Sequence, residues 1–548
     1  MERFIAKYTE EIFDIIIIGG GISGACIAYE AAARGLKVAL VEKGDFGGAT
    51  SAATSKMIHG GLRYLAKMEL GLVRESLRER RILSNIAPNF VHPIPFLLSF
   101  YKEDKTPKNL LKIGMLLYEM LSYDKNWLKD KSKKMPLHKT ISKEEVLAAI
   151  PAANPQGLKG AFMYYDCVNH FPERFTLAFL KSAVKQGAKV ANYTKMDQFI
   201  LDQSTEGKQT ITGIIATDLL SEKQYQLKAK LVINCAGPWA DLVLNKLKKT
   251  SNNKQLKRSE GIHIITKKLV DKYIFSGATK QGKHYFIVPY RDHALIGTTD
   301  KEYIGHPDDW KVTKEAIEEL LDTVNDSFGS GEKIHYEDIV YAYGGLRPLV
   351  ANEQEDVYNA SRKYELTDLS AEGIEGLLVV EGGKWTTSRG LAEVVINKAL
   401  NKLKIKAKKS NTATAYVAGS EIDNLATFIK EKQNQYQDFT PTQIEYLVKS
   451  YGREIDAVMQ LTTQNKAWQK PITSDGENLG QIVYAIRNEM AHTLSDLLLR
   501  RTGIGLLGHP GKKQLQEIAT LAATELNWSE EKTQKEISII NQLLQVPA

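Results

Sequence analysis

The sequence predicts an α/β protein that combines a split Rossmann-like dinucleotide-binding domain, a β-rich insertion and a helical C-terminal region. Three observations support this fold class. A glycine-rich turn at residues 19–24 lies between a buried strand and a helix, and a second strand, glycine turn and helix return near residue 382. Strand-like apolar runs fill residues 258–349. At 548 residues the chain exceeds what one hydrophobic core normally serves, so we expect two or three domains.

Composition limits the class of protein. Hydrophobic residues make up 43% and charged residues 25%, and no apolar run is long enough for a membrane-spanning helix. The first residues carry charges of both signs and no apolar signal region. Three cysteines (Cys26, Cys167, Cys235) lie far apart without metal-ligand spacing. We therefore expect no metal site and a cytoplasmic location, either free or peripheral on the inner face of the membrane.

The first fifty residues predict a dinucleotide-binding site. Residues 13–18 (FDIIII) are typical of a buried parallel strand, and an Ala-rich helix and a second strand follow the glycine turn. Gly19 permits the tight turn, Gly21 lets the backbone approach a pyrophosphate, and Gly24 lets the helix pack closely on the strand. The helix N-terminus offers free N–H groups to the phosphates. Glu42, at the end of the second strand, is placed to accept hydrogen bonds from ribose hydroxyls.

The polar loop after Glu42 carries a family resemblance. Its SK and HGGLRY segments, at residues 55–56 and 59–64, resemble the flavin-contacting loop of aerobic, quinone-linked, FAD-dependent glycerol-3-phosphate dehydrogenases. Further matches follow in the same order as in that family, although Trp385 departs from its pattern. They are NCAGPWA at 234–240, ALIGTTD at 294–300, GGLRPL at 344–349, GGKWTTSR at 382–389 and RNEMAHTLSDLLLRRTGIG at 487–505.

The resemblance implies a D-amino-acid-oxidase-like arrangement, in which a β-rich substrate cap interrupts the FAD-binding domain. We expect the FAD-binding domain at residues 1–89, 152–257 and 350–405, the cap at 90–151 and 258–349, and the helical C-terminal domain at 406–548.

FAD is the cofactor that the resemblance implies. The second glycine cluster would aim another helix N-terminus at the flavin, and Lys384 would help it to stabilise negative charge on the reduced ring. The predicted FAD-binding residues are Gly19, Gly21, Ser23, Gly24, Glu42, Thr50, Ser51, Ser55, Lys56, His59, Gly61, Gly237, Trp239, Gly383 and Lys384.

The implied reaction is oxidation of sn-glycerol 3-phosphate to dihydroxyacetone phosphate, with hydride transfer to flavin N5 and electrons passed to a membrane quinone. A phosphate monoester favours bidentate donors, so Arg63 and Arg347 are assigned to it. His263 is the candidate base for the alcohol proton, and a structural buried histidine is the alternative. Tyr64 and Thr386 are assigned to substrate hydroxyls. The predicted catalytic residues are His263, Arg347 and Lys384.

Three other functions compete with this one. A glycerol-3-phosphate oxidase that uses O₂ would share every residue named here. An amine or amino-acid oxidase would need a carboxylate-binding site in place of the two arginines. A flavin-dependent RNA-modifying protein would use the net charge of +8, but the sequence has no clustered basic and aromatic surface, so we expect no nucleic-acid partner.

Residues 108–123 predict an amphipathic helix at the membrane surface. Its apolar face includes Leu110, Ile113, Leu117 and Leu121, and Trp127 follows. The lysines around Trp127 are Lys125, Lys129, Lys131, Lys133 and Lys134. Such a segment is typical of docking to an anionic leaflet, near the quinone. The alternative is that the helix packs in the cap or in a homodimer interface.

Overall fold

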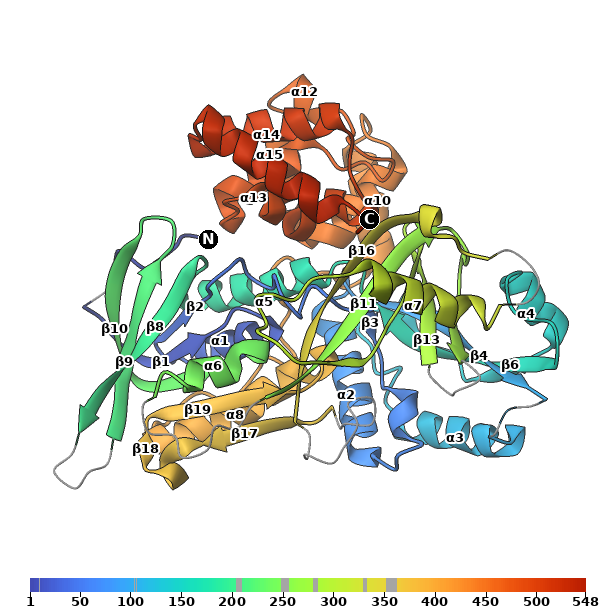
Figure 1. Ribbon diagram of the computed structural model, residues 1–548, viewed down its shortest axis with the longest axis horizontal. Helices are drawn as coiled ribbons and strands as arrows, with labels where there is room; N and C mark the ends of the chain where they lie inside the picture. The colour runs from blue at the N-terminus through green and yellow to red at the C-terminus, as the bar shows by residue number, and fades with distance from the viewer. Residues whose placement is uncertain are drawn as a thin grey trace.

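The computed structural model describes residues 1–8, 10–102, 104, 106–203, 209–247, 256–278, 284–328, 333–350 and 362–548. Within these residues the chain forms two large sheets that lie side by side, and a helical C-terminal domain packs over both of them (Figure 1). The first and last β-strands of the first sheet are separated by most of the chain, so this sheet is split by insertions.

The first sheet carries the dinucleotide motif. Its strands are β17 (Tyr364–Asp368), β19 (Leu377–Gly382), β10 (Lys223–Asn234), β1 (Ile12–Ile18), β2 (Val38–Val41) and β7 (Lys189–Ala191), in this order, with β8 (Thr194–Gln203), β9 (Gln209–Asp218) and β18 (Ile374–Glu375) attached through β9. β19, β10, β1, β2 and β7 are parallel to one another. Ile15, Ile16 and Ile17 of β1 are completely buried, as expected for a parallel strand covered on both faces. The helices α1 (Ile22–Ala33), α5 (Pro172–Lys185) and α8 (Ser388–Leu403) pack together beside it.

The second sheet forms the cap. It contains β15 (Lys301–Tyr303), β11 (Lys257–Lys267), β14 (His293–Gly297), β13 (His284–Tyr290), β12 (Ile274–Ala278), β4 (His92–Tyr101), β6 (Leu158–Val168) and β3 (Met57–Ile58), with β16 (Ile339–Leu349) paired to β11 and β5 (Lys139–Ile141) paired to β6. Most neighbours are antiparallel, but β12 and β4 are parallel. The predicted cap boundary at residue 151 needs correction, because β6 pairs with β4 and so belongs to this sheet.

The remaining helices lie around the two sheets. α2 (Leu70–Ile86) and α3 (Lys108–Leu121) lie below the cap in the view of Figure 1. Three further helices contact single strands of the sheets: α4 (Lys143–Ala149) contacts β6, α6 (Ala240–Leu244) contacts β19 and α7 (Lys314–Asn325) contacts β11. In the described part of the chain, no helix has both the length and the apolar character needed to cross a membrane.

The lysine patch expected after α3 is not a uniformly exposed surface. Lys125 is buried and pairs with Glu119, and Lys133 is buried and donates to the carbonyls of Pro88 and Val91. The prediction that these lysines face an anionic leaflet is therefore wrong for Lys125 and Lys133. Their amino groups instead satisfy acceptors that burial would leave unpaired.

The C-terminal domain contains α9 (Leu425–Gln435), α10 (Pro441–Tyr451), α11 (Ile455–Thr462), α12 (Lys466–Gln469), α13 (Leu479–Glu489), a π-helical turn (Asp496–Arg501), α14 (Lys512–Leu526) and α15 (Glu530–Leu544). It does not stand apart from the first sheet. Tyr446 of α10 packs against Phe171, next to α5, with ring centroids 5.3 Å apart, within one continuous apolar core. The helical domain is thus fixed against the domain that carries the glycine turn.

Candidate functional site

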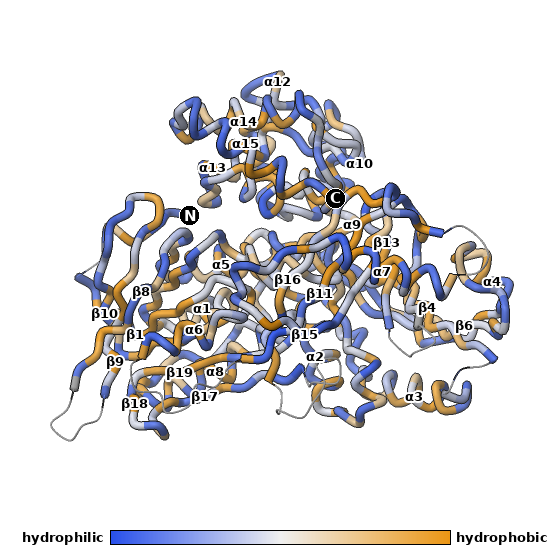
Figure 2. Tube along the Cα trace, viewed as in Figure 1, coloured by the Kyte–Doolittle hydropathy of each residue, from blue (hydrophilic) through white to orange (hydrophobic). Residues whose placement is uncertain are grey.

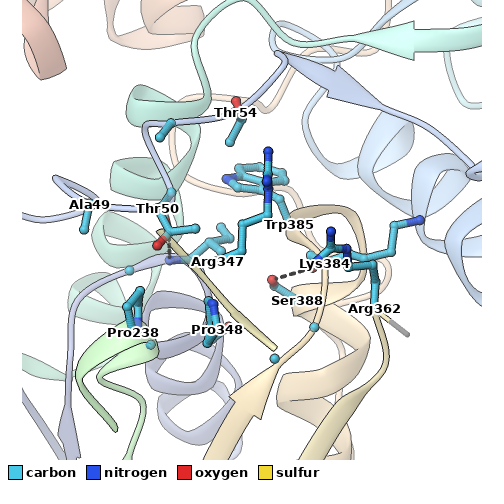
Figure 3. Close-up of a pocket in the computed structure, with 18 of the residues that line it drawn as sticks. Ala49, Thr50, Thr54, Pro238, Arg347, Pro348, Arg362, Lys384, Trp385 and Ser388 are labelled. Atoms are coloured by element: carbon cyan, nitrogen blue, oxygen red, sulfur yellow. Dashed lines mark hydrogen bonds between the residues drawn. The ribbon is translucent and has the colours of Figure 1, made fainter. Parts of the chain in front are cut away.

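A cavity of about 910 Å³ is lined by residues from both sheets, and the sequence motifs converge on it (Figure 3). Of the predicted FAD-binding residues, all except Gly24 and Lys56 line this cavity. The predicted substrate residues also line it: Arg63, Tyr64, His263, Arg347 and Thr386. Residues from the start, middle and second half of the chain therefore form a single site.

The glycine turn has the geometry that a pyrophosphate requires. Gly19 has a φ of +106°, which favours glycine. A Cβ atom on Gly24 would lie 1.9 Å from the carbonyl oxygen of Gly19, so only glycine allows this close packing of α1. A Cβ atom on Gly21 would lie 3.1 Å from Ser51 Oγ at the cavity wall. Ser51 in turn accepts a hydrogen bond from the backbone N–H of Ile22, which holds the loop against the helix N-terminus.

Glu42 closes the same turn from the second strand. Its carboxylate accepts hydrogen bonds from the backbone N–H groups of Gly20 at 2.6 Å and Gly44 at 2.8 Å. Burial raises the pKa of Glu42 above its ordinary value. Glu42 lines the cavity, so its carboxylate is available to ribose hydroxyls beside the glycine turn.

His263 lies on the cap side of the cavity. Its Nε2 atom is 2.8 Å from Ser55 Oγ, and its ring stacks on Tyr343 with centroids 5.0 Å apart. A Cβ atom on Gly297 would lie 2.4 Å from the His263 ring, so this glycine of the ALIGTT segment provides the space for the histidine. Burial, assisted by the nearby charge of Arg347, holds the pKa of His263 well below its ordinary value. The imidazole is therefore neutral at physiological pH and can accept a proton.

Arg347 projects from β16 across the neighbouring strand. Its Nη2 donates to Thr298 Oγ1 at 2.7 Å, and its Nη1 is 3.5 Å from the carboxylate of Asp300. A Cβ atom on Gly261 would lie 1.9 Å from the guanidinium, so Gly261 makes room for it. Burial lowers the pKa of Arg347 to about 10, and the charges of Arg362 and Arg63 contribute to the shift. The positive charge of the Arg347 guanidinium at the cavity wall is thus only partly balanced by the Asp300 carboxylate.

Lys384 reaches the cavity from the turn that precedes α8. Its amino group donates to Ser76 Oγ at 2.9 Å and lies 4.9 Å from the centre of the Tyr64 ring. A Cβ atom on Gly61 would meet both the Tyr64 ring and, at 3.1 Å, the Lys384 amino group. Burial lowers the pKa of Lys384 to about 8. A second cation is therefore held close to Arg63 and Tyr64.

Comparisons with known proteins agree with this site. A family model described as FAD dependent oxidoreductase matches residues 14–397, and a model of the C-terminal domain of alpha-glycerophosphate oxidase matches residues 410–533. The aerobic glycerol-3-phosphate dehydrogenase of Staphylococcus aureus (strain USA300) is 33% identical over 516 residues, which cover 92% of this chain and 88% of the relative. This chain belongs to the FAD-dependent glycerol-3-phosphate dehydrogenase family.

Solved structures support the assignment to this family. The glycerol-3-phosphate dehydrogenase from Bacillus halodurans complexed with FAD has a TM-score of 0.78 and 26% identity, covering 98% of this chain and 96% of that chain. The L-alpha-glycerophosphate oxidase from Mycoplasma pneumoniae with FAD bound, at 18% identity and a TM-score of 0.50, shares the fold over 74% of this chain and 98% of that chain. The predicted fold class and the FAD cofactor are confirmed. The glycine turn, Glu42 and the α8 N-terminus are the parts of this chain that fit a dinucleotide.

Two members of the predicted FAD set lie away from the cavity wall. Gly24 serves the packing of α1, as its close approach to Gly19 explains. The Lys56 amino group forms a buried ion pair with Glu173 at 2.9 Å, beside the rings of Tyr290 and Tyr343. Lys56 therefore forms an ion pair behind the residues that line the cavity and does not line it itself.

Arg362 was missed by sequence reasoning because it stands in none of the family motifs. It lines the cavity, is 9% exposed, and pairs with Asp300 at 2.6 Å. Its Nη1 has no hydrogen-bond partner in the part of the chain that the structure describes. Trp385, where the sequence departs from the family pattern, also lines the cavity, and its ring lies 5.1 Å from that of Phe175.

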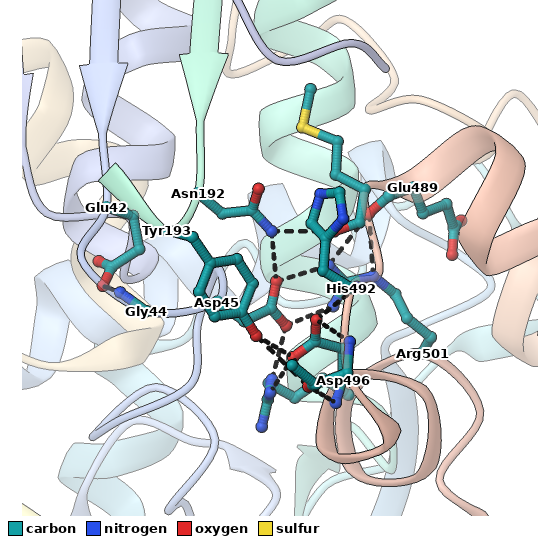
Figure 4. A network of polar contacts seen from close by, with 12 residues as sticks. Glu42, Gly44, Asp45, Asn192, Tyr193, Glu489, His492, Asp496 and Arg501 are labelled. Atoms are coloured by element: carbon teal, nitrogen blue, oxygen red, sulfur yellow. Dashed lines mark hydrogen bonds and ion pairs between the residues drawn. The ribbon is translucent and has the colours of Figure 1, made fainter. Parts of the chain in front are cut away.

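A buried polar network beside the glycine turn was also missed (Figure 4). We call it the Asp45 cluster, and its members are Asp45, Asn192, Tyr193, Asp496, Arg500 and Arg501. Asp45 accepts hydrogen bonds from Arg500 Nε at 2.6 Å and from both terminal nitrogens of Arg501 at 2.7 and 2.8 Å. The two arginines stand in the RNEMAHTLSDLLLRRTGIG segment, whose only sequence signal was the family resemblance.

Proposed function

We propose that this protein oxidises sn-glycerol 3-phosphate to dihydroxyacetone phosphate. The observation that carries the proposal is the group of cationic side chains beside a neutral histidine in the FAD cavity. Arg347, Arg362 and Lys384 line the same wall, with Asp300 as the carboxylate paired to the two arginines. Such an excess of positive charge favours a dianionic phosphate over a neutral alcohol or a zwitterionic amino acid.

Arg347 and Lys384 are suited to different parts of the bound anion. A guanidinium offers parallel donors that match a phosphate, whereas an ammonium acts as a point charge. The glycines that border each side chain support this assignment, because Gly261 and Gly61 leave room for the two cations at the wall. Arg63, Tyr64 and Thr386 complete the proposed substrate set.

His263 is proposed to accept the alcohol proton at Nε2. Nδ1 is enclosed and has no hydrogen-bond partner among the described residues, whereas Nε2 is 2.8 Å from Ser55 Oγ. The lowered pKa keeps the imidazole neutral at neutral pH, and in the tautomer with the proton on Nδ1 the Nε2 lone pair, which faces Ser55 Oγ, would be the acceptor. FAD, when bound, accepts the hydride that leaves C2 of the substrate.

Anaerobic addition of sn-glycerol 3-phosphate to the holoprotein tests this function. The flavin absorbance near the visible maximum should bleach with this substrate and not with glycerol at the same concentration. The matched variant His263→Ala should keep the flavin spectrum of the oxidised protein and bleach much more slowly. Equal bleaching by glycerol, or bleaching by an amino acid instead, would contradict the proposed substrate.

We further propose that a quinone is the electron acceptor. The cavity does not end at His263. Cross-strand neighbours His263, Gly297, Phe286, Ser276 and Leu98 form one row across β11, β14, β13, β12 and β4. At about 4.8 Å per strand, this row is about 19 Å long. The apolar residues Leu98 and Phe286 of this row line the cavity together with Leu62, Ala66 and Leu111, and the polar residues Thr106, Ser276 and His284 line it as well.

The apolar part of this lining supports an acceptor supplied from lipid. Leu111 belongs to α3, whose outer face exposes Leu110, Ile113, Leu116 and Met120 by half or more of their surface. This spacing places the four side chains on one face of the helix. Figure 2 shows α3 at the edge of the molecule, with mainly hydrophobic residues along it. Leu117 and Leu121, expected on this face, pack inward instead. A peripheral position on the inner leaflet of the membrane fits this face.

Liposome binding and acceptor use test the two finer proposals. Ile113→Glu and Met120→Glu should each weaken binding to anionic liposomes, while the control Leu543→Glu, on an exposed apolar residue of α15, should not. Quinone analogues should reoxidise the bleached holoprotein faster than O₂ does. Stoichiometric peroxide with no response to quinone would instead support the oxidase reaction.

A further inference from the structure

The loop at residues 42–48 borders the FAD cavity and is rich in glycine. Gly44, Gly47 and Gly48 make up three of its seven residues, and Gly47 has a φ of +68°. Glycines leave the unfolded loop with many conformations to lose. The Glu42 carboxylate holds the start of the loop, and the buried side chains of Asp45 and Phe46 hold its middle.

The Asp45 carboxylate is held mainly by residues of the C-terminal domain. Arg500 and Arg501 donate three hydrogen bonds to it, and Asn192 Nδ2 donates a fourth at 3.1 Å. Asn192 itself donates to the carbonyl of Met490. Burial alone would raise the pKa of Asp45, but Arg501 and Arg500 lower it well below its ordinary value.

The cluster is balanced in charge. Asp45 and Asp496 oppose Arg500 and Arg501, so two carboxylates meet two guanidiniums. Asp496 also accepts from the hydroxyl of Tyr193, whose backbone N–H donates to the carbonyl of Gly44. The network therefore joins the π-helical turn at residues 496–501 to two points of the loop (Figure 4). The arginines bind Asp45 directly, and Asp496 reaches the backbone of Gly44 through Tyr193.

Arg500 also lines the FAD cavity, where its Nε lies 3.7 Å from the position that a Cβ atom on Gly48 would occupy. A second set of ion pairs crosses the same domain interface nearby, because Arg174 and Lys181 of α5 pair with Glu489 of α13. Arg500 and Arg501 thus contact the loop from a domain that other ion pairs and a continuous apolar core hold in place.

We propose that the C-terminal helical domain, through Arg500 and Arg501 acting on Asp45, holds residues 42–48 in the FAD-binding conformation. Arg500 and Arg501 are positioning residues in this proposal. FAD binding and docking of the helical domain then strengthen each other, because a coupling between two equilibria is reciprocal. The proposal does not depend on the identity of the alcohol substrate.

FAD titration of the full-length apoprotein tests one direction of the coupling. In Arg500→Gln, the FAD dissociation constant should rise about 10-fold or more, a typical coupling factor. The control Arg487→Gln removes the same charge from an exposed pair with Glu525 in the same domain and should leave the constant unchanged. Turnover per bound FAD should be close to wild type in the control Arg487→Gln. An unchanged FAD dissociation constant in Arg500→Gln would overturn the proposal.

A double variant separates positioning from direct contact with FAD. If Arg500 acts through Asp45, then Asp45→Asn combined with Arg500→Gln should bind FAD no more weakly than Asp45→Asn alone. Additive losses would show that Arg500 acts independently of Asp45 and would overturn the positioning role.

Hydrogen exchange of the unmodified protein tests the other direction and needs no variant to fold. Saturating FAD should slow amide exchange at residues 489–501 by several-fold relative to the apoprotein. Exchange at α4 (Lys143–Ala149), which lies in the cap and away from the cluster, serves as the internal control. Equal exchange at residues 489–501 with and without FAD would overturn the proposal.

Discussion

Two pairs of arginines near the same cavity differ in how their charge is balanced. Arg347 and Arg362 share the single carboxylate of Asp300, whereas Arg500 and Arg501 meet the two carboxylates of Asp45 and Asp496. Burial lowers the pKa of Arg347 to about 10. For Arg500 and Arg501, burial also acts to lower the pKa, but the carboxylates outweigh it and raise the pKa above its ordinary value.

The difference indicates what each pair is for. A buried cation with too little counter-charge is costly on its own and gains most from an anion that enters the site. A buried cation with matched carboxylates has nothing to gain from a ligand and serves the structure. Counting the carboxylates around each arginine thus separates proposed substrate residues from structural ones.

The largest expected effect is on stability, at the balanced pair. Arg501→Met should lower the free energy of unfolding by about 3–5 kcal/mol, because it leaves the Asp45 carboxylate buried with fewer partners. Arg347→Met should cost less, because the Arg347 side chain is 23% exposed, most of its acceptors are neutral oxygens, and its removal also relieves an incompletely balanced charge. Urea denaturation of the two holoproteins measures both. Equal destabilisation by the two changes would break the comparison.

The next effect is on catalysis, at the unbalanced pair. Arg347→Met should reduce kcat/KM for sn-glycerol 3-phosphate. The reduction should correspond to a loss of about 2–5 kcal/mol of transition-state stabilisation, the cost of losing a charged hydrogen-bonded partner in a desolvated site. The visible spectrum of bound FAD should stay nearly unchanged. Arg347→Lys keeps the charge without the forked geometry and should recover only part of the loss. Equal wild-type activity on glycerol and sn-glycerol 3-phosphate would refute the phosphate role.

A smaller effect is expected with pH. Lys384 has a lowered pKa of about 8, so it is charged below that pH and becomes neutral as pH rises through it. Attraction for the anionic substrate should therefore weaken, and kcat/KM, which reports the free enzyme, should fall above about pH 8. Lys384→Arg should move this limb to higher pH. An unmoved limb in that variant would assign it to another group.

The smallest effect is expected with salt. Raising ionic strength shortens the Debye length from about 30 Å at 0.01 M to about 3 Å at 1 M. Charges at the cavity wall should be screened as substrate approaches, so the KM for sn-glycerol 3-phosphate should rise. The largely buried pairs of the Asp45 cluster should respond little, which a thermal unfolding midpoint of the holoprotein at both salt concentrations would show. The opposite pattern would reverse the assignment of the two pairs.

Local patterns explain how much of this site could be predicted from the sequence. The strand, glycine turn, helix and second strand at residues 12–41 are specified by neighbouring residues, and the structure has them in that form. His263, Arg347 and Lys384 were found through motifs, and they line one cavity. The reason for Gly261 and Gly297 appears only in three dimensions, where each makes room for a side chain from another strand or position.

Long-range pairing explains what was missed. β6 joins the cap because it pairs with β4, which lies about sixty residues earlier, and no local pattern at residues 152–168 encodes that choice. Lys133 reads as a surface lysine, yet two backbone carbonyls enclose its amino group. Asp45 reads as a loop residue, and its partners stand 455 and 456 residues further along the chain.

The separation between Asp45 and its arginines has a consequence for synthesis of the protein. At about 5–20 residues per second, a ribosome takes about 20–90 seconds to extend the chain from Asp45 to Arg500. During that time the aspartate and its glycine-rich loop have emerged without the residues that hold them. β19, which completes the order of the first sheet beside β10, also emerges late. The cofactor site is therefore among the last parts of the nascent chain to be assembled. We expect stable binding of FAD only after nearly all of the polypeptide has emerged from the ribosome.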